Sequence, residues 1–249
     1  MQAFDLTGTV AVVTGGGQGI GEGIAKNLAA AGAAVVVAAR HQERIDRVAA
    51  EINDTGAKAL AVVTDVTDKS ALVNLADAAV ETFGGLHTWV NNAGGSPVRQ
   101  PLSELSDDDW DACFTLNLKA LWQASIIAAE RMTDRGSIIN ISSPAGDRGV
   151  PGSGHYAAAK AGVNSLTKTL SLELAPKIRV NGISPGYVPT EVMMTALDTD
   201  EAALEKMAQK RVPLQRLGTP DDMGSTAVYL ASQGGSWMSG QTLIVAGGL

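Results

Sequence analysis

Short apolar runs rich in β-branched residues alternate with longer helical patterns over most of this 249-residue chain. The runs are apolar throughout rather than alternating in polarity, which is typical of parallel strands covered by helices on both faces. The expected strands are Val10–Thr14, Ala34–Ala38, Ala59–Thr64, Leu86–Val90, Ser137–Ile141, Ile178–Ile183 and Leu243–Val245. The expected helices are Ile20–Ala31, Gln42–Asn53, Lys69–Phe83, Asp107–Arg131, Tyr156–Ala175 and Pro220–Ala231. This alternation predicts a doubly wound α/β sheet in one domain, residues 1–249.

Composition narrows the classes of function. Hydrophobic residues supply 45% of the chain and charged residues 18%, enough to fill a sizeable core. The net charge of −7 and the lack of a Lys/Arg cluster argue against nucleic acid as a partner. No apolar run is long enough for a membrane span. The single cysteine, Cys113, has no basic sequence neighbour and is expected to pack inside a helix. With no export signal visible, the cytosol is the expected location.

A glycine-rich turn follows the first expected strand. Gly15, Gly19 and Gly21 fit a Gly-x-x-x-Gly-x-Gly pattern. Missing side chains let the backbone approach a pyrophosphate, and the helix N-terminus beginning near Ile20 attracts its charge. A tight loop alone would also explain such a turn, but its position at the first strand–helix crossover favours a dinucleotide site. The residues expected to hold the dinucleotide here are Gly15, Gly17, Gln18, Gly19, Ile20 and Gly21.

Three further strand ends bear on the coenzyme. The second strand ends in Arg40 and His41, with no acid for a ribose 2′-hydroxyl. A guanidinium pairs bidentately with phosphate, so NADP(H) is favoured and NAD(H) remains possible. Asp65, before Val66, could accept from an adenine amino group, although a simple turn acid explains it equally well. After the fourth strand, the small residues of Asn92-Ala93-Gly94 would let a flat ligand lie against the backbone.

Tyr156 and Lys160 lie four residues apart, so on a helix they stack on one face within reach of a shared ligand. An ammonium close to a phenol favours the phenolate and lowers the pKa of the tyrosine, which predicts a proton-transfer pair. Thirteen residues before the tyrosine, Ser143 follows a buried strand. Ser142 is its neighbour, but the alternation of side chains and the thirteen-residue spacing favour Ser143.

The segment from Gly186 to Pro213 interrupts the strand–helix rhythm. It is helical in composition and holds Met193, Met194, Leu197 and Met207. Two interpretations stay open: a lid that covers a bulky or lipophilic substrate, or an outer helix pair packed on the core.

With these motifs in place, the chain resembles the short-chain dehydrogenase/reductases from Thr7 to Gly248. The matching segments are Thr14–Gly21, Asp65-Val66, Asn92-Ala93-Gly94, Asn117, Ser143, Tyr156, Lys160, Pro185-Gly186 and Thr190. The resemblance implies a Rossmann-type fold with seven parallel strands, a homotetramer, and coenzyme and substrate at the carboxyl ends of the strands.

The resemblance also implies roles. Tyr156 would be the general acid/base, and Lys160 would bind the nicotinamide ribose and lower the tyrosine pKa, helped by the positive ring of the oxidised coenzyme. Ser143 would hydrogen-bond the substrate oxygen, and Asn117 would hold a water of the proton relay. The nicotinamide carboxamide would be fixed by Pro185, Gly186, Val188 and Thr190.

The expected function is therefore the interconversion of a secondary alcohol and a ketone. Resemblance to bacterial hydroxysteroid dehydrogenases over Ile178–Gly186 and Arg216–Gly240 favours a bulky substrate. One alternative is reduction of 3-oxoacyl groups on acyl carrier protein or CoA. Asp134 and Leu172 stand where a basic carrier-protein patch is expected, although Arg131 and Arg135 are near.

A second alternative is a non-catalytic nucleotide-binding protein, against which the complete set of four catalytic residues argues. His155 is expected to pack in a loop rather than act as a base. His41 and His87 lack the spacing of a metal site, and no metal is expected. The chain departs from the family pattern in two places. One is the missing basic patch at Asp134 and Leu172, and the other is Ala246-Gly247-Gly248-Leu249, where Asp-Gly-Gly is common.

Overall fold

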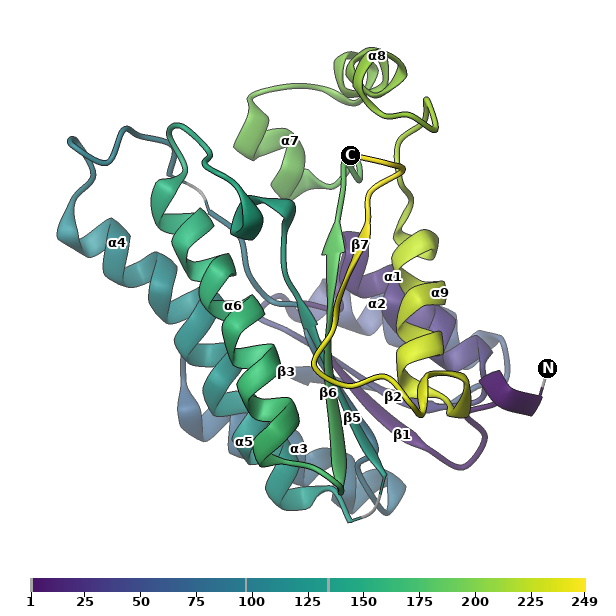
Figure 1. Cartoon of the computed structure of the whole chain (residues 1–249). Coiled ribbons are helices and arrows are strands. Elements are labelled where there is room, and N and C mark those ends of the chain that lie inside the picture. The colour runs from purple at the N-terminus through teal and green to yellow at the C-terminus, as the bar shows by residue number, and fades with distance from the viewer. Residues whose placement is uncertain (1, 97, 134) are drawn as a thin grey trace.

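The computed structural model describes residues 2–96, 98–133 and 135–249. One seven-stranded sheet runs through them in the order β3-β2-β1-β4-β5-β6-β7, with every neighbouring pair parallel (Figure 1). This order confirms the predicted doubly wound sheet. The strands are β1 (Val10–Thr14), β2 (Ala34–Ala39), β3 (Ala59–Val63), β4 (Thr88–Asn91), β5 (Gly136–Ile141), β6 (Ile178–Pro185) and β7 (Thr242–Val245).

Strand β4 lies further along the chain than the apolar pattern predicted. It begins at Thr88 rather than Leu86 and continues through Asn91, which is buried. Asn91 pairs with Asn140 across the sheet, and its Nδ2 donates to Asn140 Oδ1 at 2.9 Å. A buried amide that finds such partners can sit in the middle of a sheet, and an apolar run cannot reveal that.

The helices are α1 (Gly19–Ala30), α2 (Gln42–Asp54), α3 (Lys69–Phe83), α4 (Asp107–Phe114), α5 (Ala120–Arg131), α6 (Gly154–Glu173), α7 (Glu191–Leu197), α8 (Glu201–Arg211) and α9 (Pro220–Ala231). The predicted helix over residues 107–131 is confirmed as one uninterrupted helical stretch, but the sequence did not show that a π-helical turn, Thr115–Lys119, lies between α4 and α5. Its predicted start is confirmed, since Ser106 caps α4 by accepting from the Asp109 backbone N–H at 3.1 Å.

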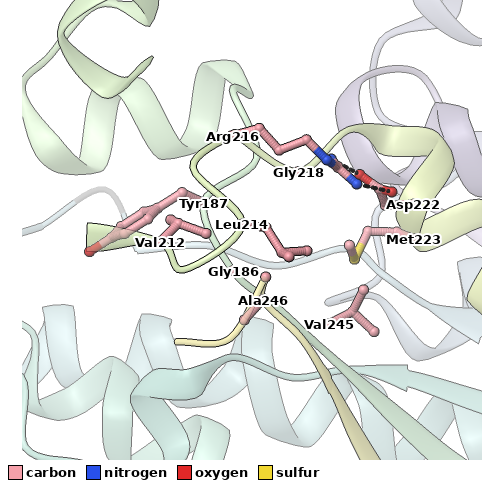
Figure 2. A pocket seen from close by; sticks show the side chains of 11 residues that line it. Gly186, Tyr187, Val212, Leu214, Arg216, Gly218, Asp222, Met223, Val245 and Ala246 are labelled. Atoms are coloured by element: carbon pink, nitrogen blue, oxygen red, sulfur yellow. Dashed lines mark hydrogen bonds and ion pairs between the residues drawn. The ribbon is translucent and has the colours of Figure 1, made fainter. Parts of the chain in front are cut away.

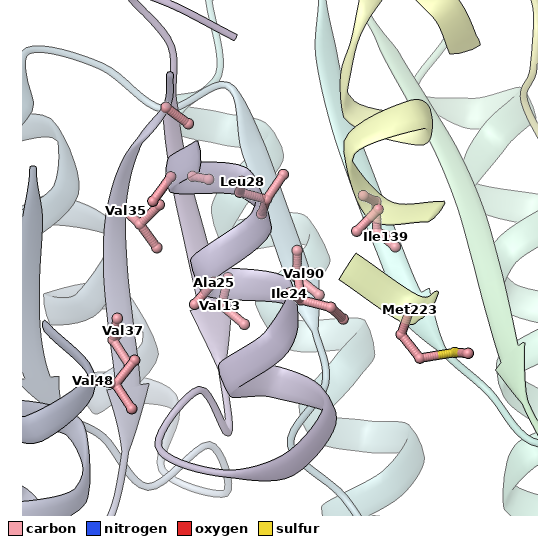
Figure 3. Close-up of a cluster of buried hydrophobic side chains, with 14 of the residues drawn as sticks. Val13, Ile24, Ala25, Leu28, Val35, Val37, Val48, Val90, Ile139 and Met223 are labelled. Carbon is pink, nitrogen blue, oxygen red and sulfur yellow. The ribbon is translucent and has the colours of Figure 1, made fainter. Parts of the chain in front are cut away.

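Helices cover both faces of the sheet (Figure 1). One hydrophobic cluster joins the sheet to α1, α2 and α9, and includes Ile24, Leu28 and Met223 (Figure 3). The other joins it to α3, α5 and α6 around the fully buried Trp89. Because every neighbouring pair of strands is parallel, the carboxyl ends of all seven strands meet at one edge of the sheet, where ligands bind in open α/β sheets.

Helices α7 and α8 lie beyond this edge, beside the C-terminal end of the chain (Figure 1). They form the segment that the sequence predicted as helical between Gly186 and Pro213. Among the described residues, no helix has both the length and the apolar character to cross a membrane.

Candidate active site

The glycine-rich turn between β1 and α1 adopts a backbone that side chains would block. Gly15 and Gly19 have φ angles of 64° and 56°, in the left-handed region that glycine enters at little cost. A Cβ on Gly21 would lie 2.2 Å from the Gly15 carbonyl oxygen. The turn thus brings bare backbone to the start of α1, where Gln18 is the N-cap residue and makes no side-chain cap bond.

A threonine and an asparagine lock this turn to the end of β4. Thr14 Oγ1 accepts from the backbone N–H groups of Asn92 and Ala93 at 3.0 and 3.1 Å. Asn92 Nδ2 donates in turn to the carbonyls of Thr14 and Gly15 at 2.9 and 3.1 Å. The sequence predicted Asn92 and Ala93 as a platform for a ligand and Thr14 as the start of the matching glycine-rich segment. It could not show the bonds between them, because the partners of Thr14 lie 78 and 79 residues away.

Four other predicted coenzyme residues lie in this turn or after the neighbouring strand β2. Gly17 packs against α2, where a Cβ would lie 3.2 Å from the Cβ of Arg44. Ile20 is partly buried against the core. Arg40 and His41 are exposed after β2, and His41 makes no side-chain bond as N-cap of α2.

Asp65 occupies a tight turn after β3. Its Oδ1 accepts from the backbone and the hydroxyl of Thr67 at 2.9 and 2.7 Å. These bonds, and to a smaller extent the nearby Arg40 guanidinium, hold the pKa of Asp65 below its ordinary value. Val66 lines a small cavity together with Thr14, Asn91 and Ala93. Asp65 is therefore a turn residue, as one of the two interpretations predicted, and Arg40 is close enough to influence its pKa.

Tyr156 and Lys160 lie one turn apart on α6, with Lys160 Nζ 5.6 Å from the centroid of the tyrosine ring. The ammonium is buried and donates to the carbonyl of Ile141, the last residue of β5, at 2.8 Å. The predicted stacking on one face is confirmed. The bond to Ile141 fixes the lysine against the sheet edge.

The pKa of Tyr156 moves in the direction opposite to the prediction. Burial raises it to about 12, and the hydrogen bond with the Ser143 hydroxyl offsets only part of that increase. Removing a phenolate from water disfavours the charged form, which outweighs the bond. The protein groups alone therefore do not supply the depressed tyrosine pKa that the Tyr–Lys spacing suggested.

Burial acts on Lys160 as well and lowers the pKa of its ammonium to about 8. An unfolded lysine has a pKa of 10.5, so between those two values the unfolded chain binds more protons than the folded chain. The free energy of unfolding contributed by this group therefore rises with pH over that window. Near neutral pH the folded protein bears the full cost of burying the charge, on the order of 3 kcal/mol.

We expect Lys160→Met to be more stable than the wild type near neutral pH, with a difference that shrinks as the pH rises through 8. Urea unfolding at about pH 7 and about pH 9.5 measures it. Lys168→Met, at an exposed position of the same helix, is the matched control and should show no such pH dependence. A Lys160→Met difference that stays constant with pH would contradict a buried ammonium.

Ser143, rather than Ser142, lies beside the tyrosine. The Ser143 hydroxyl is close enough to the Tyr156 phenol to lower its pKa, and it accepts from the Ala145 N–H at 3.2 Å. Ser142 is buried on the other side and donates to Asn164 Oδ1 at 2.6 Å. Successive strand residues point to opposite faces, as the choice between the two serines assumed.

Asn117 lies in the π-helical turn, and its side chain is bonded to its own protein neighbours. Nδ2 donates to the carbonyls of Gly95 and Cys113 at 2.9 and 3.0 Å, and Oδ1 accepts from the Gly95 N–H at 3.0 Å. A Cβ on Gly94 would lie 2.8 Å from Asn117 Oδ1 and 3.5 Å from Lys160 Nζ. The structure thus brings Asn117 and Lys160 to the same glycine.

Cys113 lies behind this group. It is buried, and burial raises the pKa of its thiol, which agrees with a packing role. The sequence did not reveal Lys160 as a neighbour of this thiol. Its positive charge lowers the pKa of Cys113 and offsets part of the increase that burial causes. Lys160 is 47 positions further along the chain, so no local signal could show it.

The loop after β6 approaches both the glycine-rich turn and the C-terminal segment. Pro185 ends β6, and the Gly186 N–H donates to the Val245 carbonyl at 3.0 Å. Val188 is buried, and Thr190 caps α7 by accepting from the Met193 N–H at 3.2 Å. A Cβ on Gly19 would lie 2.9 Å from Thr190 Cγ2, so this loop closes over the turn.

A cavity of about 100 Å³ lies on the other side of that loop (Figure 2). Gly186 and Tyr187 line it together with the segment after α8 and the end of the chain. At its rim Arg216 pairs with Asp222 through two short bonds of 2.7 and 2.9 Å, which lower the pKa of Asp222 to about 2. The cavity is not lined by Tyr156, Lys160, Ser143 or Asn117. Ala246, which replaces the common aspartate, packs on Gly186 there.

Within the described part of the chain, no group of three or more His, Cys, Asp or Glu side chains could hold a metal ion. The functional groups gathered at the sheet edge are a phenol, an ammonium, a hydroxyl and an amide. They lie beside a backbone turn suited to a pyrophosphate. That set can move protons and stabilise a developing oxyanion.

Comparison with known proteins gives the same picture. A family model described as "Enoyl-(Acyl carrier protein) reductase" matches residues 15–249. An uncharacterized oxidoreductase of Mycobacterium tuberculosis is 39% identical, over 100% of this chain and 95% of its own length. A short-chain type dehydrogenase/reductase of Picea abies is 38% identical, over 98% of this chain and 93% of its own.

A solved structure has a closely similar backbone. It is a 7α-hydroxysteroid dehydrogenase complexed with NADH and 7-oxo glycochenodeoxycholic acid, 34% identical, with a TM-score of 0.93 over 99% of this chain and 96% of that one. Sequence motifs, sheet order and these likenesses agree along the whole chain. The protein therefore belongs to the short-chain dehydrogenase/reductase family of oxidoreductases.

Proposed function

We propose that this protein is an NADP(H)-dependent reductase/dehydrogenase that interconverts a secondary alcohol and a ketone on a bulky or lipophilic substrate. The observation that carries the proposal is the group at the end of β5. There the Ser143 hydroxyl is close enough to the Tyr156 phenol to lower its pKa, and Lys160 lies one helical turn away. This arrangement suits protonation of a carbonyl oxygen in one direction and removal of a hydroxyl proton in the other.

The residues at the sheet edge fit a nicotinamide dinucleotide. The turn at Gly15 and Gly21 requires glycine, because a Cβ at either position would collide with neighbouring protein atoms, and the bare backbone that results suits a pyrophosphate. The small residues Ala93 and Gly94, and the loop from Gly186 to Thr190, would hold the nicotinamide half. When bound, the coenzyme supplies or accepts the hydride.

The protein's own part is proton transfer and placement. Tyr156 would give its phenolic proton to the substrate oxygen, and Ser143 would donate a hydrogen bond to that oxygen as negative charge develops. Lys160, held by the Ile141 carbonyl, places a positive charge beside the phenolate that results. Asn117 fixes Gly94 and Gly95 against this group.

The preference for NADP(H) rests on the end of β2. Arg40 is exposed there and close enough to Asp65 to lower the pKa of that carboxyl. The backbone N–H groups at the start of α2 also support this preference, because the side chain of the N-cap residue His41 makes no hydrogen bond to them. An arginine and a helix N-terminus together suit a 2′-phosphate, whereas a ribose hydroxyl is usually bound by an acid.

Arg40→Asp is expected to lower kcat/KM for NADPH by roughly 10²-fold and to raise that for NADH, because a carboxylate repels phosphate and binds hydroxyls. Initial rates with each coenzyme give the ratio. Arg211→Asp is the control, since Arg211 is an exposed arginine of α8. An unchanged NADPH/NADH ratio in Arg40→Asp would remove the arginine from coenzyme selection.

Helix α7 approaches two separate segments, which supports the lid interpretation of residues 186–213. Arg44 Nη1 of α2 pairs with Glu191 Oε2 at 3.0 Å. In the loop after β4, a Cβ on Gly95 would lie 3.2 Å from Val192 Cγ1. Met193, Met194 and Met207 are partly buried on α7 and α8. Flexible thioether side chains in a cover of this kind suit irregular apolar substrates.

A panel of ketones tests the reaction and its substrate class. Oxidation of NADPH would be followed by absorbance with a 7-oxo bile acid, cyclohexanone and acetoacetyl-CoA. We expect turnover with the first and a lower kcat/KM with the others. Reduction of none of the three, by a protein that binds NADPH, would count against an alcohol–ketone reaction.

The alternative of 3-oxoacyl reduction receives support from the description of the matched family model, which names an acyl carrier protein enzyme. The surface does not favour such a carrier. Leu172 is 80% exposed where a basic residue would be needed, and Arg131 is engaged with Asp77 at 2.6 Å. Asp134 lies outside the described residues. Preferential turnover of acetoacetyl-CoA would reverse this ranking.

We also propose a homotetramer. Large apolar side chains are exposed in several places, among them Leu172, Trp122 and Trp237, of which Trp237 is fully exposed. Apolar exposure on this scale suits burial against other copies of the chain. Light scattering coupled to size exclusion measures the assembly.

We also propose that the protein is located in the cytosol. A reducing cytosol suits the free and buried Cys113.

A further inference from the structure

Next to Tyr156 lies a buried histidine that has no part in the proton transfer described above. His155 is the second residue of α6 and is 1% exposed. It was expected to pack in a loop, but it lies within the helix. Its Nε2 is 3.0 Å from Ser96 Oγ, in the loop that joins β4 to α4.

The second contact of Ser96 fixes the position of the ring proton. Ser96 Oγ donates to the Val98 carbonyl at 3.0 Å. A carbonyl oxygen can only accept, so the single hydroxyl proton is used there. The bond with the ring must therefore run from Nε2–H to Ser96 Oγ. His155 therefore carries a proton on Nε2, and its Nδ1 finds no partner among the described residues.

The segment that this bond holds, Gly94–Ser96, packs on the catalytic group. Gly95 exchanges two hydrogen bonds with the Asn117 side chain, at 3.0 and 2.9 Å. Gly94 lies close to both Asn117 Oδ1 and Lys160 Nζ, which a Cβ there would approach to 2.8 and 3.5 Å. Ser96, the next residue, is the one that His155 binds. The segment is thus fixed at one end by Asn117 and at the other by the residue preceding Tyr156.

We propose that His155 is a positioning residue, which holds Gly94–Ser96 through its Nε2–H and so keeps Asn117 and Lys160 in place for proton transfer at Tyr156. This inference rests on the proposed function. Without that donor the Ser96 hydroxyl loses a buried partner, and the segment gains freedom where the Asn117 bonds need it fixed. Small displacements of groups around a reacting centre lower kcat steeply.

Substitutions separate this role from simple packing. His155→Leu keeps an apolar volume and removes the donor, and we expect kcat with the best ketone of the panel to fall roughly tenfold or more. The dissociation constant of NADPH, measured by fluorescence, should not change, because the glycine-rich turn is untouched. His155→Gln can place an amide N–H where Nε2–H lies, so we expect it to restore most of kcat.

His155→Asn can replace only the nearer Nδ1 and should behave like His155→Leu. Ser96→Ala removes the acceptor and should lower kcat as much as His155→Leu, with no further loss in the double variant. Ser103→Ala, at an exposed serine of the same loop, is the matched control and should keep the wild-type kcat.

A second measurement needs no turnover. The chain has only three histidines, so ¹⁵N spectra of the labelled protein resolve each ring, and His155→Gln assigns the signal. We expect the His155 ring to carry a proton on Nε2. A ring protonated on Nδ1 alone would overturn the proposal whatever the reaction is.

The kinetic outcomes are equally decisive. A folded His155→Leu variant with the wild-type kcat, or a His155→Gln variant as slow as His155→Leu, would overturn the positioning role. If His155→Leu does not fold, Ser96→Ala decides, and an unchanged kcat in it would end the proposal. A wild type that reduces no ketone is a different result, since it removes the proposed function and leaves the spectroscopic test standing.

Discussion

Replacing Tyr156 by phenylalanine is expected to lower kcat by at least about 10³-fold, because the substitution removes the only phenolic proton at the end of β5. The ring stays, so the packing of this side chain is kept. The Ser143 hydroxyl loses the neighbouring phenol, and Lys160, 5.6 Å from the ring, has no phenolate to stabilise. Stopped assays at high enzyme concentration measure the residual rate.

Coenzyme binding separates this result from a loss of structure. NADPH fluorescence should give nearly the wild-type dissociation constant in Tyr156→Phe, since its hydroxyl contributes little to the pyrophosphate site. Tyr229→Phe, on α9 and packed near Phe4, is the matched control and should retain full activity. A Tyr156→Phe enzyme with near-normal turnover would assign the proton transfer to another group.

Gly21→Ala is expected to abolish coenzyme binding and to destabilise the fold. The added methyl would lie 2.2 Å from the Gly15 carbonyl oxygen and 2.4 Å from Asn92 Nδ2. A carbonyl oxygen of the backbone cannot rotate away as a flexible side chain can, so the turn must open. We expect the dissociation constant of NADPH to rise by more than about 100-fold, which is nearly 3 kcal/mol of binding free energy. The free energy of unfolding should fall by about 1–3 kcal/mol.

Gly149→Ala is the control for this prediction. Gly149 is exposed, and a Cβ there would meet nothing within 4 Å. Isothermal titration with NADPH and urea unfolding should therefore match the wild type. Retention of tight coenzyme binding by Gly21→Ala would mean that the dinucleotide does not approach the protein through this turn.

Several features could be predicted because they are written in short stretches of chain. The four-residue step from Tyr156 to Lys160 places both on one helical face wherever that helix packs. The two-residue alternation of β5, continued into the residues that follow it, separates Ser143 from Ser142 in the same way. Strand ends in a parallel sheet share one edge, which gathers Arg40 and Asp65 without knowledge of any contact.

Other features depend on segments that meet only in the folded protein. The helix pattern over residues 107–131 gave no sign of the π turn, because a buried amide at Asn117 bonds to Gly95, 22 residues earlier. Ser96, the partner of His155, lies 59 residues away, so the sequence showed only that a histidine precedes Tyr156.

The amino-acid sequence by itself determined the order of strands and helices, the bare glycine turn and the identity of the groups that could exchange a proton. Only the tertiary structure decided how those groups are charged. The pKa of Tyr156 is raised to about 12 and that of Lys160 is lowered to about 8, mainly because the fold shields both side chains from water. Desolvation is a property of everything packed around an ionisable group, and most of what packs here comes from distant parts of the chain.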